Sequence, residues 1–497
     1  MHTNTGRRRA KITAALFISS FLLLGLVQPF QGTASASLTF AKLASFPALG
    51  SASIASVVQS RDGSTIVVGL TDGYIQISRD SGATWKEQST TACTTDCSGA
   101  PSAIGKWSAL AISPDGAHLV AGDKTPTTGD LWTATLSETG TTWVDHPSAG
   151  HEEWKSVVIS DDGTRMAATG FKTPNVHNGQ ITFSGDSGTV WGWRSNPVMI
   201  SKIIASPDLK IITGITIGSD PSLAGQVSDD YGSTWQNAIP YISYNLRGGA
   251  GSAAADRLVS FDKDGILYSS TSSGLFWDDV PAISNAATTW TDTSISGDGS
   301  HIVALDSAKN IYLSKDASAT WDTTALTGSA GTATAVSISQ NGSSILALTN
   351  SEIWRAVLNE APNLQLDTSD QVGVVDHAIS PILPLNFGGA ANYSVAPALP
   401  TGLTIDPYLG TISGTPSASH PLATYTITAT GIVDPSQHSS KTFNLSVITD
   451  YVPVSQNVHL YGVIRTSGGT PLGNATIQYV PSQMANLITT YSDSSGN

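Results

Sequence analysis

The segment "VDHPSAGHEEW" gathers ionisable side chains that could do chemistry in this chain of 497 residues. It places His146, His151, Glu152 and Glu153 in one loop, and His177 follows in the next long loop. Imidazole and carboxylate groups can share a metal ion or act as a general acid and base. The spacing does not match the HExxH pattern, and loop histidines and glutamates are commonly only solvated. These five residues are therefore candidate ligand-binding groups, with no metal assigned.

The loops that carry these residues connect the strands of a repeated unit. "WSALAISPDGAHLVAG" starts at Trp107, "WKSVVISDDGTRMAATG" at Trp154 and "WTDTSISGDGSHIVAL" at Trp290. Apolar residues alternate on either side of Asp-Gly, the pattern of a tight β-hairpin. Each unit predicts four short antiparallel strands, A to D, and such repeats of about 40–50 residues predict a β-propeller. Seven units fall at 53–88, 107–146, 154–194, 200–238, 241–280, 288–323 and 333–358.

The last unit ends after its third strand, "EIWRAVL", which would leave the ring with an open edge. The segment "SLTFAKLAS" at Ser37–Ser45 reads as an unassigned strand near the N-terminus. We therefore expect it to supply the missing outer strand of the last unit.

A second phrase, "SRDSGATW" at Ser78–Trp85, recurs at Ser184–Trp191, Ser228–Trp235 and Ser314–Trp321. We call these segments the box turns. The Asp carboxylate can accept backbone N–H groups of a tight turn, Gly permits positive φ, and the Trp ring can pack between repeats. A catalytic centre is needed once, whereas a structural joint is needed in every repeat. The residues with this structural role are Asp80, Trp85, Glu138, Trp143, Asp186, Trp191, Asp230, Trp235, Asp316 and Trp321. Glu138 and Trp143 belong to a degenerate copy, in which Glu138 replaces the aspartate.

The box turns match the motif S-x-D-x-G-x-T-W, so residues 37–358 resemble the Asp-box (BNR) propellers, which include sialidases and photosystem II assembly factors. The resemblance implies a seven-bladed ring in which the box lies away from the functional face. A sialidase would also need an arginine triad, a Tyr–Glu pair and the F/Y-R-I-P stretch. That stretch is absent, and Arg194, Arg247 and Arg257 show no sign of convergence. The sequence therefore disfavours sialidase activity.

Two further modules follow the repeats. Residues 364–450, with "YSVAPALPTGLTIDPYLGTISGTP", resemble the immunoglobulin-like (cadherin-like) modules of bacterial surface proteins. Some relatives bind Ca²⁺, but the aspartates of this segment do not form a recognisable ligand set, so no cofactor is predicted. Residues 451–497 resemble the opening of a carboxypeptidase-regulatory-like, transthyretin-type β-sandwich that is truncated at Asn497.

Export is predicted from the N-terminus. "GRRRAKITAALFISSFLLLGLV" combines a cationic start with a short apolar run, and "ASA" at Ala34–Ala36 provides a cleavage pattern, so residues 1–36 are expected to be a signal peptide. Removal of this peptide would change the net charge of the chain from −14 to −18. So negative a chain disfavours nucleic acid and anionic membranes as partners. No later segment of the sequence is apolar enough to span a bilayer. Export also makes a disulfide between Cys93 and Cys97 the expected state of "CTTDC".

The function predicted from these observations is binding at the cell exterior. A–B turns and box turns are short and uniform and lie on one face, the turn face. The B–C and D–A loops carry the insertions and lie on the opposite face, which we call the loop face. This face is the default place for a ligand site. The favoured hypothesis is a secreted or surface protein whose loop face binds a protein or polysaccharide without catalysis. The alternative is a glycoside hydrolase on the same face, which would need two carboxylates at about 5–10 Å. Phe171 and Arg247 complete the candidate ligand-binding set.

Overall fold

The computed structural model describes residues 39–449, apart from short segments, and the strands 476–479 and 488–491. The segments left out between 39 and 449 are 90–96, 99–100, 102–104, 126–128, 138–139, 172–179, 196–199, 217–224, 238–245, 263, 282, 284–288, 323–332, 359, 367–369, 390 and 433. Residues 36–450 form one compact unit. Within the described part the fold is almost entirely β-structure, and its one helical segment is the 3-10 turn η1 (Pro147–Ala149). The prediction of an all-β chain is confirmed.

The described strands between Ser53 and Val357 form seven successive antiparallel meanders. Meander 1 contains β2 (Ser53–Gln59), β3 (Ile66–Gly73), β4 (Ile75–Ser78) and β5 (Lys86–Gln88). Meander 2 contains β7 (Gly105–Ile112), β8 (His118–Asp123), β9 (Leu131–Ser137) and β10 (Gly140–Asp145), with the short β6 (Cys97–Ser98) parallel to β10. Meander 3 contains β11 (Glu153–Ile159), β12 (Met166–Phe171), β13 (Gln180–Ser184) and β14 (Gly192–Ser195).

The remaining meanders repeat this order. Meander 4 contains β15 (Ile200–Ala205), β16 (Ile212–Thr216), β17 (Gly225–Ser228) and β18 (Gln236–Asn237). Meander 5 contains β19 (Leu246–Gly251), β20 (Leu258–Asp262), β21 (Leu267–Ser270) and β22 (Asp278–Asp279). Meander 6 contains β23 (Trp290–Ile295), β24 (Ile302–Asp306) and β25 (Ile311–Ser314), and meander 7 contains β26 (Ala335–Ile338), β27 (Ser344–Leu348) and β28 (Ile353–Val357).

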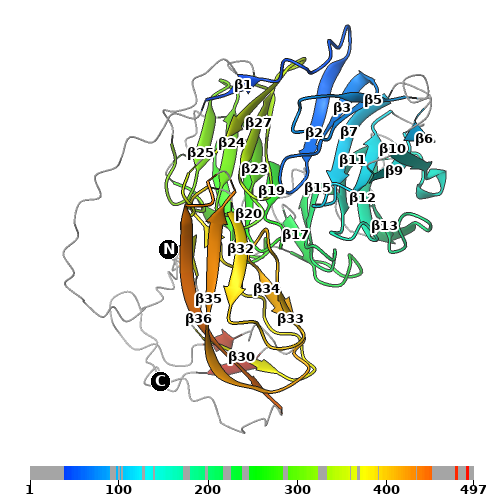
Figure 1. Ribbon diagram of the computed structural model, residues 1–497. Helices are drawn as coiled ribbons and strands as arrows, with labels where there is room; N and C mark the ends of the chain where they lie inside the picture. Colours follow the sequence, from blue (N-terminus) through cyan, green and yellow to red (C-terminus); the bar gives the residue numbers. More distant parts are fainter. Residues whose placement is uncertain are drawn as a thin grey trace, which may run out of the picture. The chain divides into compact units, whose positions relative to one another are not determined.

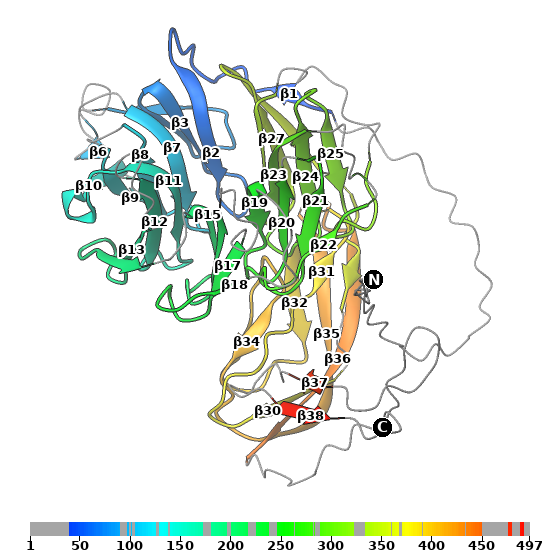
Figure 2. The ribbon, with the colours of Figure 1, turned by 180° about the vertical axis from the view of Figure 1, so that it is seen from behind.

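The first strands of the meanders contact one another in a closed cycle. Each of β2, β7, β11, β15, β19 and β23 touches the first strand of the next meander, and β26 touches β2. Figures 1 and 2 show this succession as a passage of colour from blue through cyan to green around the ring. Radial repetition of small sheets around a closed ring is the arrangement of a β-propeller, and it leaves only short sheet edges.

The N-terminal segment completes the last meander, as the sequence predicts. Strand β1 (Ala41–Lys42) pairs antiparallel with β28, with Ala41 opposite Arg355. The Lys42 Nζ lies 2.5 Å from Glu352 Oε1, and Phe40 packs into the core of meanders 6 and 7. The two ends of the ring are therefore joined by strand pairing, which covers the edge of β28.

Tryptophans at the start of the first strands join neighbouring meanders. Trp107, Trp154 and Trp290 are at most 3% exposed, and each packs in a cluster formed by its own and the preceding meander. Each indole N–H donates to a glycine carbonyl of the preceding meander, at the end of its second strand or in its B–C loop, with Nε1–O distances of 3.0–3.1 Å. These rings therefore bury apolar area and satisfy their only donor at the same joint.

The box turns owe their shape to side chains that bind the backbone. In meander 4, Gly232 N donates to Ser228 Oγ at 2.8 Å, and Thr234 N donates to Asp230 Oδ1 at 2.7 Å. Gly232 has φ +77°, and its carbonyl accepts the Trp235 Nε1–H at 3.1 Å. The serine and aspartate bonds recur in the other three box turns, at Ser78–Trp85, Ser184–Trp191 and Ser314–Trp321. In the degenerate copy, Trp143 is buried, and Glu138 lies outside the described residues.

A β-sandwich follows the ring. Its larger sheet has the order β30 (Asp370–Val374), β36 (His438–Ile448), β35 (His420–Gly431) and β32 (Ala391–Ala396). Two strand pairs complete it, β29 (Leu364–Gln365) with β31 (Leu385–Asn386) and β33 (Leu403–Ile405) with β34 (Ile412–Gly414). The core contains Tyr425 stacked on Phe443, with ring centroids 5.5 Å apart. Of residues 451–497, the structure describes only the hairpin of β37 (Thr476–Tyr479) and β38 (Ile488–Tyr491).

Candidate functional site

The connection from meander 2 to meander 3 runs from Asp145 at the end of β10, through η1, to Glu153 at the start of β11. His146 opens this connection, but it is only 6% exposed and its Nε2 lies 2.8 Å from Thr133 Oγ1. Its ring packs 5.9 Å from Trp191, and burial lowers the pKa of the imidazole below its usual value. His146 therefore lies inside the joint between the two meanders and does not reach the exposed part of the loop.

His151 lies at the surface of the same connection and pairs with an aspartate of the B–C loop. Its Nδ1 is 2.5 Å from Asp130 Oδ1, and about half of its side chain is exposed. Asp145 is close to this pair. Desolvation raises the pKa of Asp145, the nearby Asp130 charge raises it further, and the His146 N–H and the His151 charge partly offset these effects. Asp130, Asp145 and His151 therefore form one electrostatically coupled group.

The two glutamates of the connection have different surroundings. Glu152 is 4% exposed, and its backbone N–H donates to the Gly129 carbonyl at 3.0 Å. Glu153 binds Lys155 Nζ at 2.5 Å and lies 3.7 Å from Lys124 Nζ. Lys155 also lies over the ring of Phe171, 5.4 Å from its centroid. Glu152 thus belongs to the interior of the loop, whereas Glu153 and Phe171 share a surface cluster with two lysines.

Trp193 on β14 is the residue of this region that sequence reasoning missed. Its ring is 40% exposed and stacks on the buried Trp154, with centroids 6.1 Å apart and an interplanar angle of 10°. Gly150, at φ +99°, lets the connection pass close to this ring, because a Cβ there would lie 3.1 Å from Trp193 Cζ2. A large aromatic ring is therefore held open to solvent beside the connection that carries His151. The available signal was a second Trp, two residues beyond the box-turn Trp191.

Of the two remaining candidate ligand-binding residues, only Arg247 lies in the described part of the chain, and it belongs to another meander. Arg247 is exposed on β19, in meander 5, and His177 and Cys93 lie outside the described residues, as does the side chain of Cys97. Among the described residues, no group of three or more His, Cys, Asp or Glu side chains is arranged to hold a metal ion. In the same part of the chain, no helix is long and apolar enough to cross a bilayer.

The turn face is held together by hydrogen bonds between A–B turns of adjacent meanders. Arg61 N donates to the Pro114 carbonyl at 2.9 Å, and Asn341 N donates to the Arg61 carbonyl at 2.9 Å, so the turn of meander 1 links meanders 2 and 7. Asp161 N donates to the Pro207 carbonyl at 2.9 Å. Gly297, in meander 6, is bonded in the same way to the turns on both sides of it. These bonds fix the A–B turns as one surface.

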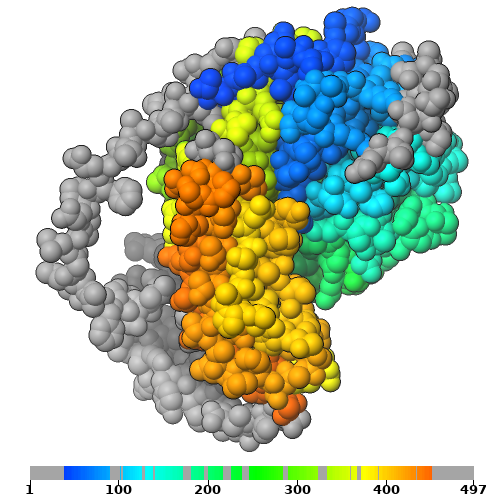
Figure 3. Space-filling view, viewed as in Figure 1, coloured from blue at the N-terminus to red at the C-terminus, as the bar shows by residue number. Residues whose placement is uncertain are grey.

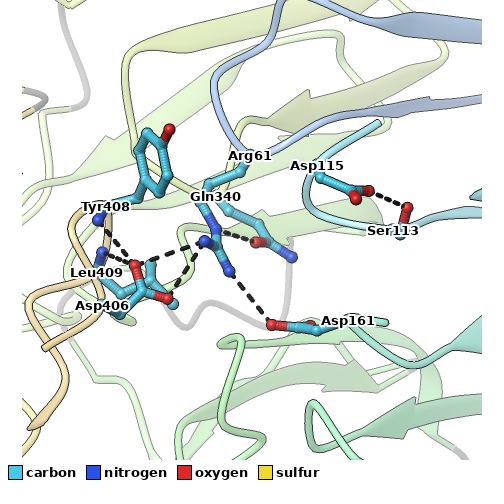
Figure 4. A network of polar contacts seen from close by, with 8 residues as sticks. All are labelled: Arg61, Ser113, Asp115, Asp161, Gln340, Asp406, Tyr408 and Leu409. Atoms are coloured by element: carbon cyan, nitrogen blue, oxygen red, sulfur yellow. Dashed lines mark hydrogen bonds and ion pairs between the residues drawn. The ribbon is translucent and has the colours of Figure 1, made fainter. Parts of the chain in front are cut away.

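The Arg61 side chain joins this surface to the β-sandwich (Figure 4). It lies 3.2 Å from both Asp161 of meander 3 and Asp406 of the sandwich, and its Nε donates to Gln340 Oε1 at 3.3 Å. Tyr408 stacks near the guanidinium, 5.5 Å from ring centroid to Cζ. The arginine side chain is only 13% exposed. One cation therefore links meanders 1, 3 and 7 with the sandwich, which sequence reasoning did not predict.

Beside this contact, ring and sandwich enclose a cavity of about 350 Å³. Asp161, Pro207 and Gly297 line it from the ring, and Leu383, Asp406 and Leu409 line it from the sandwich. In Figure 3 the yellow and orange surface of the sandwich continues into the surface of the ring. The sandwich thus occupies the turn face, and the loop face is the side that it leaves free.

Asp161 should make stability depend on pH. Desolvation raises its pKa from 3.8 to about 6, helped by Asp406, Asp115 and Asp162 and opposed by Arg61. The folded protein therefore binds a proton that the unfolded chain has already lost between pH 4 and 6, and this contribution to stability declines as the pH rises through that range. We expect the Tm of Asp161→Asn, relative to the wild type, to increase from pH 4 to 6.5 and then level off. A constant difference measured by calorimetry over that range would contradict this role.

Residues 361–448 match the family model described as "Putative Ig domain". No curated protein matches the sequence. Matching solved structures include "YCF48 bound to D1 peptide", with 13% identity and a TM-score of 0.48, covering 66% of this chain and 97% of that one.

Two other matching structures are a xyloglucanase and a β-propeller domain. The GH74 xyloglucanase from Xanthomonas campestris has 13% identity and a TM-score of 0.46, covering 67% of this chain and 58% of that one. The Myceliophteria thermophila Cps50 (Swd1) β-propeller domain has 11% identity and a TM-score of 0.46, covering 65% and 100%. At these values the neighbours carry no functional argument. The chain is an all-β protein in which a β-propeller is followed by an immunoglobulin-like domain similar to that family.

Proposed function

We propose that this chain is an exported, non-catalytic binding protein whose loop face binds a glycan. In this proposal residues 1–36 direct export, the seven meanders are the blades of an Asp-box propeller, and the immunoglobulin-like domain holds the turn face. The observation that carries the proposal is the exposed ring of Trp193. Sugars present flat apolar faces ringed by hydroxyl groups, and a fixed aromatic ring beside polar groups suits both features.

The surroundings of Trp193 support this ligand class over a flat protein partner. The ring is held by Trp154, whose indole N–H is itself bonded to Gly129 at 3.0 Å, so little side-chain entropy remains to be lost on binding. The His151 imidazole on the adjoining connection and the Asp130 carboxylate on the neighbouring B–C loop can bond hydroxyl groups. A pre-formed site with one aromatic platform and a few polar groups is typical of small-ligand recognition.

Trp193→Ala should weaken glycan binding by more than about tenfold, because a truncated aromatic anchor commonly costs at least 2 kcal/mol. The measurement is a glycan screen followed by calorimetric titration of the polysaccharides that bind. Phe276→Ala is the matched control, since Phe276 is 55% exposed but lies at the turn after β21 in meander 5. Equal losses in both variants, or no loss in Trp193→Ala, would contradict the proposal.

A glycoside hydrolase is the second candidate, because Asp145 and Asp130 are close enough to affect each other and the pKa of Asp145 is raised. A raised carboxyl pKa suits a general acid, and glycoside hydrolysis needs a second carboxyl group close by. Reducing-sugar release should be read in the same screen. If the wild type releases reducing sugars and Asp145→Asn does not, while Asp145→Asn still binds the polysaccharide, hydrolysis replaces non-catalytic binding as the proposed function.

A further inference from the structure

A second tryptophan, Trp132, lies near the candidate site without being one of the joints of the ring. It is the second residue of β9, directly after the B–C loop of meander 2, and it pairs with Asp145 of β10 and Ala121 of β8. Its ring packs against the core between meanders 1 and 2 but is only half-buried. Unlike the tryptophans at the joints, it donates its indole N–H to no residue that the structure describes, and this N–H is not closed off from solvent. Trp132 therefore has ring surface and a donor that its packing does not use.

The strand register places Asp145 beside this ring. Residues directly opposite each other in an antiparallel pair project from the same face of the sheet, so Trp132 and Asp145 share one face of meander 2. Besides desolvation, the charges of Asp130 and His151 shift the pKa of Asp145, so both groups lie within electrostatic reach of it. Trp132 is thus next to the carboxyl groups of Asp145 and Asp130.

The same group of residues continues to Trp193. His151 Nδ1 is 2.5 Å from Asp130 Oδ1, and Gly150, its neighbour in sequence, lies against the Trp193 ring. Trp193 stacks on the cluster between meanders 2 and 3, whereas Trp132 belongs to the cluster between meanders 1 and 2. Packed sheets lie about 10 Å apart, so rings in successive layers are separated by at least about that distance. A single sugar cannot cover both rings, but a chain of sugars can.

The charges beside the two rings disfavour an anionic ligand. Asp145 is exposed and forms no ion pair with any residue that the structure describes, and the counter-ion of Asp130 is an imidazole. Lys124 and Lys155, the lysines of this region, already face Glu153 at 3.7 and 2.5 Å. Residues 123–155 therefore offer carboxylate oxygens to a ligand, with no unpaired cation among those described.

Arg194 does not change this balance. It follows Trp193 in β14, but its guanidinium lies over Phe183, 4.9 Å from Cζ to the ring centroid, and its Nη1 donates to Ser233 Oγ of meander 4 at 2.6 Å. Successive residues of a strand project from opposite faces, so this side chain points away from the joint with meander 2. The groups open to a ligand beside both rings are aromatic surface, indole N–H, imidazole and carboxylate oxygens.

We propose that the ligand of the loop face is an uncharged polysaccharide whose chain lies across both Trp132 and Trp193, with Asp130 and Asp145 accepting its hydroxyl groups between them. This inference rests on the proposed function, because Trp193 is the platform of that proposal. A neutral sugar chain supplies flat C–H faces for the two rings and hydroxyl donors for the carboxylates. Carboxylates or sulfates on the chain would instead add a further negative charge beside Asp145, a like-charge contact that binding sites disfavour.

The first test compares polymers that share a backbone and differ in charge. Hydroxyethylcellulose is titrated against carboxymethylcellulose, and dextran against dextran sulfate, by calorimetry. We expect the neutral polymer of one pair to bind and its charged form to bind at least about tenfold more weakly. Asp145→Asn removes the unpaired charge and should narrow that difference. A charged polymer that binds as tightly as its neutral counterpart would overturn the inference.

The second test measures affinity for oligosaccharides of increasing length, prepared from the polymer that binds. Trp132→Leu keeps an apolar side chain against the core and removes the aromatic ring. Trp354→Leu is the matched control, because Trp354 is also half-buried on a strand but lies in meander 7. We expect the affinity of the wild type to rise with length until both rings are covered. Trp132→Leu should lose that gain, which we expect to be about tenfold, while Trp354→Leu keeps the length dependence of the wild type.

The outcomes separate this inference from the proposed function. Equal effects of Trp132→Leu and Trp354→Leu would show that Trp132 acts only through the core, and the inference would be wrong. If Trp193→Ala abolishes binding while Trp132→Leu has no effect, the proposed function stands and this inference fails. If no polysaccharide binds, both fail.

Discussion

Trp154→Ala is expected to lower the free energy of unfolding by about 3–5 kcal/mol, the usual cost of removing a fully buried aromatic side chain. The Trp154 side chain has no exposed surface and packs with Val120 and Leu131 of meander 2 and with Val157 of its own meander. Truncation would leave a cavity at this joint and remove the donor that binds the Gly129 carbonyl. It would also remove the support under Trp193, so binding should fall together with stability.

Chemical denaturation of Trp154→Ala and Trp193→Ala separates these two effects. Trp193 is 40% exposed, so its truncation should cost far less stability than that of Trp154 while still removing the aromatic platform. Both variants are measured in the same denaturant series, with near-ultraviolet circular dichroism to verify packing of the ring. A Trp154→Ala protein as stable as the wild type would show that this tryptophan is not a joint between meanders.

Arg61→Ala is expected to lower the free energy of unfolding by about 2–3 kcal/mol and to weaken the attachment of the immunoglobulin-like domain. Removing one partner of a fully buried ion pair costs more than this, but Asp161 and Asp406 keep part of their side chains exposed, at 40% and 27%. The loss leaves both carboxylates beside the cavity without their shared cation. The backbone bonds between A–B turns remain, so the ring itself should stay folded.

Calorimetry and limited proteolysis between the ring and the domain would measure this change. Arg165→Ala is the matched control, because Arg165 also lies on the turn face but bonds the Asp208 carbonyl and stacks on Tyr231 within the ring. We expect the Arg61 variant to show a separate, lower transition for the domain and faster cleavage. Identical melting and cleavage in the two variants would mean that Arg61 does not hold the domain.

The repeats were predictable because their signals are local. Asp-Gly turns, alternating apolar residues and the box turns each specify a few consecutive residues, and their recurrence then specifies the ring. The pairing of β1 with β28 was predictable for a related reason, since a repeat that ends early requires a strand from elsewhere. In contrast, the boundaries of the signal peptide and of the C-terminal module depend on residues outside the described part of the chain.

The site was harder to predict because exposure depends on neighbours that are distant in sequence. His146 looks like a solvent-exposed loop residue, but the box turn of meander 3 covers it, with Gly188 so close that a Cβ there would meet the imidazole at 2.8 Å. Trp193 looks like another buried tryptophan, but the position over Trp154 leaves its ring open. Arg61 belongs to an A–B turn, a class of turn that the sequence places on the turn face, and only the docking of a separate domain gives it Asp406 as a partner.

We propose that ligand binds the loop face while the immunoglobulin-like domain occupies the turn face. Hydrogen–deuterium exchange of the intact protein, with and without a polysaccharide that it binds, tests this claim most directly. We expect slower exchange at residues 146–155 and 192–195, with no change at residues 60–64 and 160–165. Protection confined to the A–B turns, with the segment around Trp193 unaffected, would contradict it.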